Sequence, residues 1–200
     1  MEGELPLHSY VPFWAAQGLT DWMLDQDIKL AKETERGEFT VLHLLCTKKL
    51  EGKRFECIKR VLRDVPDLLT KPNKDGELPI HRATLEGDLE CVQYFLKIDP
   101  KLLYAEDKRG QIPLHFVRDL KLCKWMVSQD EKLLRHETHY KIIPLQTLFN
   151  WDAPFEVIKW IIEQDPDLIR IKNDVGQDFL DLTKDYGDPE LLEYLKQFKG

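Results

Sequence analysis

A phrase of a proline, an aliphatic residue and a histidine returns along this chain at a nearly constant interval. It reads "LPLH" at residues 5–8, "LPIH" at 78–81 and "IPLH" at 112–115. On the proline position, six matches are 35, 38, 34, 31 and 35 residues apart, at Pro6, Val41, Pro79, Pro113, Pro144 and Phe179. A catalytic motif usually occurs once, whereas a phrase with a period of roughly 20–50 residues indicates a repeat architecture.

A second phrase lies in step with the first. It reads "DPKLLYAEDKRG" at residues 99–110, "DEKLLRHETHYK" at 130–141 and "DPDLIRIKNDVG" at 165–176. "VPDLLTKPNKDG" at 65–76 is the same phrase, and "DIKLAKETERG" at 27–37 is one residue shorter. Two phrases that keep the same register indicate one structural unit, repeated about six times.

Each unit predicts a turn, a short helix, a second turn, a longer helix and a loop. A glycine such as Gly76 suits a turn that needs positive φ, and Pro79 then occupies the first helical turn, where its missing N–H costs nothing. Asp88 is a predicted N-cap for a helix over residues 89–98, which carries apolar residues at helical spacing. Asp-Pro is expected to end that helix and to begin a loop of about ten residues.

Paired aliphatic residues inside the second phrase are predicted to seal the joints between neighbouring units, since no unit can bury its apolar face alone. They are Leu30, Leu68, Leu69, Leu102, Leu103, Leu133, Leu134, Leu168 and Ile169.

With these phrases the chain resembles an ankyrin-repeat protein, and "LPIHRATLEGDLECVQYFL" at residues 78–96 is the best match. The resemblance implies an all-α fold, an α-solenoid of helix-turn-helix units joined by β-hairpin-like turns. It implies one domain over 1–200, with repeats at 3–36, 37–74, 75–108, 109–139, 140–174 and 175–200. The last repeat, with Asp188 as a cap and a polar outer face, is a predicted terminal capping repeat.

Several positions depart from the family pattern. The family's threonine before proline, whose hydroxyl pairs with the histidine ring, remains only at Thr40. Elsewhere the ring must find backbone partners, or the turn must depend on apolar packing. The fourth repeat lacks about three residues near 118–123, which explains the step of 31. The chain opens at a turn, so either the first repeat caps itself or the chain is a piece of a longer protein.

Composition excludes several classes of function. The net charge of −7 argues against nucleic-acid binding, which needs a basic face. No apolar run is long enough to span a membrane, and the acidic N-terminus is not a secretory signal. Four singly placed cysteines fit a reducing intracellular compartment, and we expect a cytoplasmic monomer.

The residues that could carry chemistry have simpler structural interpretations. His8, His43, His81 and His115 occupy one position of successive units, about 10 Å apart, too far to share a metal ion. His136 and His139 could form a weak metal clip, but a solvated loop is favoured. Cys57, Cys91 and Cys123 fall on second helices as packing residues, and the basic segment 48–54 is expected to be a solvated loop.

The resemblance places partner contacts on turn tips and first-helix ends. The candidate partner-binding residues are Trp14, Arg36, Lys74, Asp75, Glu77, Lys108, Arg109, Gln111, His139, Tyr140 and Trp151. For Trp14 and Trp151, packing and surface contact both remain open. No catalytic residue, metal ligand or cofactor is predicted.

The implied function is a non-catalytic protein–protein interaction scaffold whose partner is another protein, bound by the concave face and turn tips. The alternative is a regulatory or targeting ankyrin module of a larger enzyme or effector protein. A stand-alone enzyme is the least favoured hypothesis, because the sequence places no base beside a nucleophile.

Overall fold

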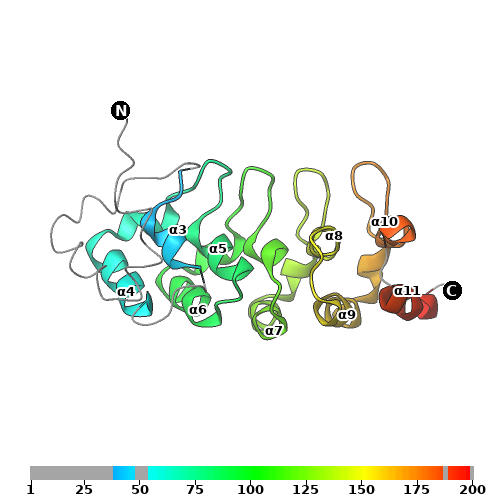
Figure 1. Ribbon diagram of the computed structural model, residues 1–200. Helices are drawn as coiled ribbons and strands as arrows, with labels where there is room; N and C mark the ends of the chain where they lie inside the picture. Colours follow the sequence, from blue (N-terminus) through cyan, green and yellow to red (C-terminus); the bar gives the residue numbers. More distant parts are fainter. Residues whose placement is uncertain (1–37, 48–53, 187–188, 199–200) are drawn as a thin grey trace, which may run out of the picture. The chain divides into compact units, whose positions relative to one another are not determined.

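The computed structural model describes residues 38–47, 54–186 and 189–198, and this part of the chain is mostly helical with no strand (Figure 1). The prediction of an all-α protein is therefore confirmed. The chain divides into two compact units, Met1–Lys108 and Arg109–Gly200. The expectation of a single domain of six repeats stays a prediction.

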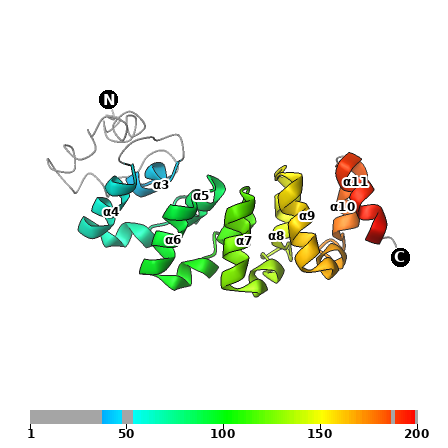
Figure 2. The ribbon, with the colours of Figure 1, turned by 90° about the horizontal axis from the view of Figure 1, so that it is seen from below.

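In the described part of the first unit, a short helix, a longer helix and a 3-10 helix follow one another twice. The elements are α3 (Val41–Leu45), α4 (Arg54–Asp64), η2 (Pro66–Thr70), α5 (Pro79–Leu85), α6 (Leu89–Ile98) and η3 (Pro100–Tyr104). The short helices α3 and α5 pack against each other, and each also packs against the longer helix that follows it (Figures 1 and 2).

The second unit continues the same order of elements. They are η4 (Pro113–Phe116), α7 (Leu120–Gln129), η5 (Glu131–Arg135), α8 (Pro144–Asn150), α9 (Phe155–Gln164), η6 (Pro166–Arg170), α10 (Phe179–Tyr186), α11 (Pro189–Leu195) and η7 (Lys196–Phe198). Within this unit α8 packs against α10 and α7 against α9, so the helices form two rows (Figure 1).

Aspartate caps explain where α6 and α7 begin. The Asp88 carboxylate accepts a hydrogen bond from the Cys91 amide at 3.1 Å, as predicted. In the second unit, Asp119 accepts from the Leu122 amide at 2.8 Å in the same way. Each bond satisfies one of the amides that a helix leaves unpaired in its first turn.

The "DPxLL" phrase forms a short 3-10 helix, where the sequence predicted the start of a loop. Asp99 and Asp165 cap these helices by accepting from the amides two residues later, at 3.0 and 3.3 Å. The proline follows in the first turn, where it needs no hydrogen-bond acceptor. The phrase was interpreted as a helix end because Asp-Pro breaks an α-helix, but it does not prevent a new 3-10 turn.

The paired aliphatic residues lie inside, as predicted. Within their own units, Leu68, Leu69, Leu102, Leu133, Leu134, Leu168 and Ile169 are all buried. Leu103 is half-buried, and Leu30 lies outside the described residues. Within each compact unit these 3-10 helices also pack against the next first helix, as η2 does against α5, η5 against α8 and η6 against α10.

The fourth repeat has the shortest first helix in the described part of the chain. Its η4 has four residues, whereas α8 in the next repeat has seven. The sequence placed the missing residues near 118–123, whereas the shortened element is η4 itself, a single 3-10 turn where the pattern predicted a short α-helix. In its place the Arg118 guanidinium donates to the Asp152 carbonyl at 2.7 Å.

We predict that Leu102→Ala lowers the free energy of unfolding by about 2–5 kcal/mol, because the side chain is 2% exposed and its loss leaves a cavity. Chemical denaturation measures the change. Val175→Ala is the control, since Val175 is 72% exposed and should change stability by less than about 0.5 kcal/mol. A loss below about 0.5 kcal/mol for Leu102→Ala would contradict its place in the packed interior of the first unit.

Candidate partner-binding groove

The histidine position joins each first helix to the loop that follows in the chain. The Leu78 amide donates to His81 Nδ1 at 2.9 Å, and His81 Nε2 donates to the Ala105 carbonyl at 3.0 Å. In the second unit the Ile112 amide donates to His115 Nδ1 at 3.1 Å. Each imidazole thus caps its own helix with one nitrogen and uses the other to hold the next loop. The expectation that these rings find backbone partners is confirmed.

Gln146 occupies the same position and makes the same two hydrogen bonds. Its Oε1 accepts from the Ile143 amide at 3.2 Å, and its Nε2 donates to the Ile171 carbonyl at 3.0 Å. An amide has no acid–base chemistry near neutral pH, so the position needs only an acceptor and a donor at the right separation. This substitution favours a structural role for the histidines.

Thr40 retains the pairing that the resemblance implied. Its hydroxyl lies 2.9 Å from His43 Nδ1, and its amide donates to the same nitrogen at 3.2 Å. His43 Nε2 lies 2.9 Å from the Glu77 carbonyl. Burial lowers the pKa of His43 from 6.5 to about 4, so the ring is neutral at neutral pH.

Hairpin-like loops project beside the first helices. In the first unit, Asn73 Oδ1 accepts from the amides of Asp75 and Glu77, both at 2.9 Å, and Glu77 accepts from the Asn73 side chain. Gly76 lies at φ 84°, and a Cβ there would meet the Lys108 amide nitrogen at 2.7 Å, so glycine is required. The Lys108 amide donates to the Asp75 carbonyl at 3.0 Å, which joins this loop to the next.

The second unit repeats this linkage between its own loops. The His139 amide donates to the Arg109 carbonyl at 3.0 Å, and the Asp174 amide donates to the Tyr140 carbonyl at 3.1 Å. Thr138 Oγ1 accepts from the amides of Tyr140 and Ile142, as Asn73 does in the first unit. The loop tips are therefore held in register by backbone hydrogen bonds.

A groove lies between these loops and α8. It has a volume of about 290 Å³ and is lined by Arg109, Gln111, Thr138, Tyr140, Ile142, Thr147, Asn150 and Trp151. We call these eight residues the groove. Four of the predicted partner-binding residues meet there, namely Arg109, Gln111, Tyr140 and Trp151.

Two aromatic side chains shape the groove. Tyr140 is 55% exposed at a loop tip. Trp151 is half-buried, and its ring meets the buried ring of Phe116 edge to face, with centroids 5.1 Å apart. Trp151 therefore packs on one side and lines the groove on the other, which answers the question left open by the sequence.

Thr147 was not predicted as a site residue. It is 4% exposed on α8, and its Oγ1 has no hydrogen-bond partner among the described residues. By contrast, the hydroxyl of buried Thr84 in α5 donates to the Ile80 carbonyl at 2.9 Å. A buried hydroxyl without a partner costs roughly 1–3 kcal/mol of stability, and the Thr147 oxygen is buried beneath the groove surface.

The other predicted residues are distributed differently. His139 belongs to the second unit. Its backbone bonds to Arg109 and its ring lies against Gly110. The first unit contains four more of the predicted residues, which take part in hydrogen bonds within or between its loops. They are Lys74, Asp75, Glu77 and Lys108. Trp14 and Arg36 lie outside the described residues. Sequence analysis also missed Asn150 in the groove and the exposed loop-tip Val175.

The cysteines are packing residues, as predicted. Cys57, Cys91 and Cys123 lie on α4, α6 and α7, and all four cysteines are buried. Burial raises the pKa of Cys123 to about 12. The pKa of Cys91 is also raised, mainly by burial and secondly by its contact with Cys46. A thiol needs its thiolate form to react, so these two are poor nucleophiles at neutral pH.

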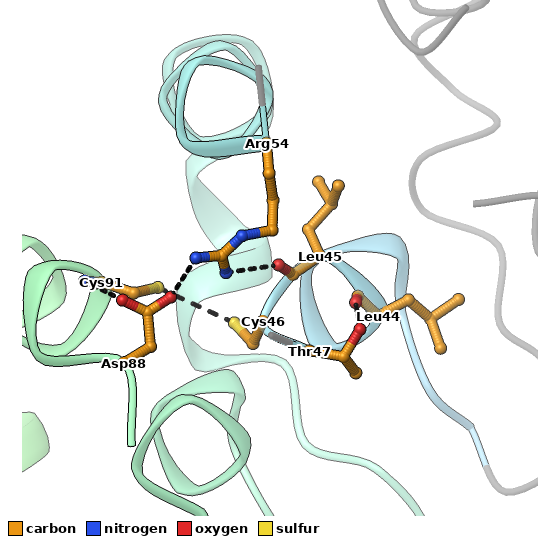
Figure 3. A network of polar contacts seen from close by, with 7 residues as sticks. All are labelled: Leu44, Leu45, Cys46, Thr47, Arg54, Asp88 and Cys91. Carbon is orange, nitrogen blue, oxygen red and sulfur yellow. Dashed lines mark hydrogen bonds and ion pairs between the residues drawn. The ribbon is translucent and has the colours of Figure 1, made fainter. Parts of the chain in front are cut away.

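Figure 3 shows the surroundings of Cys46 and Cys91, whose sulfur atoms lie 4.0 Å apart. Arg54 bridges the Leu45 carbonyl, at 3.0 Å, and the Asp88 carboxylate. The prediction of a solvated basic loop is wrong for Arg54, whose side chain is only 15% exposed. Residues 48–53 of that segment lie outside the described residues.

No metal site forms among the described residues, because no three histidine, cysteine, aspartate or glutamate side chains converge. The two histidines of the suggested clip have other neighbours. His136 Nε2 lies 3.3 Å from the Gly110 carbonyl, and its ring meets His115 edge to face, with centroids 5.9 Å apart.

Comparison with known proteins adds no assignment. The sequence matches no protein-family model and no curated protein. Within the described ranges, every helix is too short or too polar to cross a membrane.

We predict that His81→Gln is tolerated whereas His81→Ala lowers the free energy of unfolding by about 1–3 kcal/mol. Glutamine makes both hydrogen bonds at position 146, but alanine leaves the Leu78 amide and the Ala105 carbonyl without this partner. Thermal or chemical denaturation compares the variants. If the two variants lost equal free energy of unfolding, the two side-chain hydrogen bonds would not contribute to stability.

A second prediction concerns pH. His43 has a pKa of about 4 when folded and 6.5 when exposed, so the unfolded chain binds the extra proton between these values. The contribution of neutral His43 to the free energy of unfolding is complete above pH 6.5 and is lost as the pH falls toward 4. At about 1.4 kcal/mol per pKa unit, the loss is about 3 kcal/mol.

The measurement is the free energy of unfolding as a function of pH for the natural chain and for His43→Gln. Carboxylates titrate in both proteins, so the difference between the curves isolates His43. We expect a flatter curve for the variant between pH 4 and 6.5. Parallel curves would contradict the buried neutral ring.

Proposed function

We propose that this chain is a non-catalytic protein–protein interaction scaffold of the ankyrin-repeat type. In this proposal its repeats form one α-solenoid, and loop tips and first helices contact another protein. The observation that carries it is the groove, in which four of the predicted partner-binding residues, Arg109, Gln111, Tyr140 and Trp151, lie together.

The local geometry supports the assignment of repeat type. In residues 79–104 and again in 144–170, a first helix begins with proline and is capped by the side chain at its third position. A longer helix, a 3-10 helix and a projecting loop follow. The recurrent cap and loop-to-loop hydrogen bonds hold neighbouring tips at fixed separation. Such rigidity suits a binding surface, because little ordering remains to oppose association.

The exposed side chains support binding as well. Tyr140 and Val175 project from adjacent loops of the second unit, at 55% and 72% exposure. Aromatic residues and arginine are enriched among the residues that dominate binding energy, and the groove holds Tyr140, Trp151 and Arg109. The mixture of an apolar wall, amide side chains and one cation resembles the composition of a protein interface.

The candidate catalytic groups support a non-catalytic role. The described histidines of the repeat position are engaged in helix caps, and the four cysteines are buried. Burial raises the pKa of the Cys91 and Cys123 thiols, which disfavours the thiolate that a nucleophilic role requires.

We predict that affinity capture with the full chain recovers one stoichiometric protein, identified by mass spectrometry, and that Arg109→Ala with Tyr140→Ala abolishes the capture. The matched control is Lys101→Ala with Tyr104→Ala, which removes a similar pair from η3 in the first unit. That control should retain the partner.

Capture that survives in the Arg109 and Tyr140 variant would overturn the groove as the binding site. Recovery of no stoichiometric protein by the natural chain would overturn the scaffold itself. Circular dichroism of each variant confirms that the helices are intact, so that loss of capture reports binding.

A further inference from the structure

We propose that Cys46 and Cys91 form a reversible disulfide when the protein meets hydrogen peroxide, and that this bond covalently joins the end of α3 to α6. The two sulfur atoms lie 4.0 Å apart and face each other (Figure 3). The pair belongs to the first unit, so the inference does not depend on the groove or on the proposed function. Three features carry it, namely the contact of the two sulfurs, the Arg54 bridge beside them and the length of chain between the two cysteines.

The pair joins two helices that are far apart in the sequence. Cys46 is the C-cap of α3, and Cys91 lies in the first turn of α6. Two sulfurs in a disulfide are about 2.05 Å apart, so the native contact must shorten by roughly 2 Å. We assign this movement to rotation of the two side chains and a small shift at the end of α3, because Cys46 lies just beyond the last of its five residues.

Arg54 already holds the ends of these two helices together. Its guanidinium donates to the Leu45 carbonyl at 3.0 Å and to the carboxylate of Asp88, which is the N-cap of α6 (Figure 3). The Arg54 and Asp88 side chains are only 15% and 8% exposed. Taking two charges out of water costs much of what their attraction returns, so such a pair contributes little net stability. We therefore assign the bridge a positioning role, in which it keeps the two thiols opposite each other.

The order of the reaction follows from the surroundings of the thiols. Burial, followed by the contact with Cys46 and the charge of Asp88, raises the pKa of the Cys91 thiol, so the first attack is assigned to Cys46. The Cys46 thiolate attacks one oxygen of hydrogen peroxide, which breaks the O–O bond, releases hydroxide and leaves a sulfenic acid on Cys46.

The second step forms the disulfide. The Cys91 sulfur attacks the Cys46 sulfur and displaces the hydroxyl group, which takes up the Cys91 proton and leaves as water. The hydroxide of the first step takes up the Cys46 proton. In total the two thiols lose two electrons and two protons, and one peroxide is reduced to two molecules of water.

Burial controls the rate of this reaction. Both cysteines are buried, so even a reagent as small as hydrogen peroxide reaches Cys46 only when the end of α3 opens locally. Crosslinking of the folded chain is therefore slow and requires lasting contact with the oxidant. A thiol reductant reverses it through the same opening.

The crosslink changes the stability of the first unit. It closes a loop over residues 46–91, which contains α4, η2 and α5. Closing a long loop removes conformational freedom from the unfolded chain, which raises resistance to unfolding. Oxidation thus converts a unit held together by packing and hydrogen bonds into one that is also closed by a covalent bond.

The test treats the folded full chain with hydrogen peroxide, alkylates the remaining thiols after unfolding and maps the peptides by mass spectrometry. We expect a linked pair of peptides that contains Cys46 and Cys91, alkylated Cys57 and Cys123, and loss of the link after reduction with dithiothreitol. The unfolding temperature of the oxidised chain should rise by about 5–15 °C. Alkylation of all four cysteines, or a link from Cys46 to a different cysteine, would overturn the proposal.

Matched variants identify the pair. Cys57→Ala with Cys123→Ala leaves only the proposed pair and should crosslink at close to the natural rate. Cys91→Ala should instead leave a sulfenic acid on Cys46, which dimedone traps. Loss of the link in the first variant would contradict the pairing. Peptide mapping of the natural chain needs no substitution, so it decides the question even where a variant misfolds.

Arg54→Lys tests the positioning role. Lysine keeps the charge but lacks the planar fork that reaches two acceptors at once. General loosening of the fold would only speed oxidation of Cys46. Loss of positioning should also raise, several-fold, the share of oxidised Cys46 that dimedone traps before Cys91 reacts with it. An unchanged share would show that Arg54 does not position the pair.

Discussion

In the repeats of His43, His81, His115 and Gln146, one side chain performs two tasks, and the rest of their structure depends on it. It accepts a hydrogen bond from the residue that begins the first helix and donates one to the following loop. His81 bonds to Leu78 and Ala105 in this way, and Gln146 bonds to Ile143 and Ile171. Because both ends of the bridge are backbone groups, the sequence around it can vary while the joint between units is kept.

The bridge also explains why the loops can carry function. Their tips are joined by backbone hydrogen bonds, as between His139 and Arg109, and their bases are held by the bridging side chains. Exposed tip side chains such as Tyr140 and Val175 are thus presented from loops with an ordered backbone. The geometry concentrates an aromatic pair, a buried threonine and a single cation in the groove, and it encloses the thiols in the packed interior.

Much of this fold could be predicted from the sequence, because periodicity and proline chemistry are local signals. The helix register, the buried leucine pairs and the structural histidines follow from them. The sequence did not predict the 3-10 helices, because Asp-Pro indicates the end of an α-helix and does not show that a 3-10 helix begins there. Arg54 turned inward toward Asp88, which depends on a neighbour 34 residues away. Thr147 and the groove depend on how α8 packs beside a shortened repeat, and no local pattern reports that packing.

The tautomer of the bridging histidines tests the central claim most directly. Nitrogen-15 chemical shifts of His43, His81 and His115 report which ring nitrogen carries the proton. The bridge requires the proton on Nε2 and an acceptor lone pair on Nδ1 in all three rings at neutral pH. Uniform Nε2–H tautomers would support the account, whereas Nδ1–H tautomers or a rapidly exchanging mixture would contradict it.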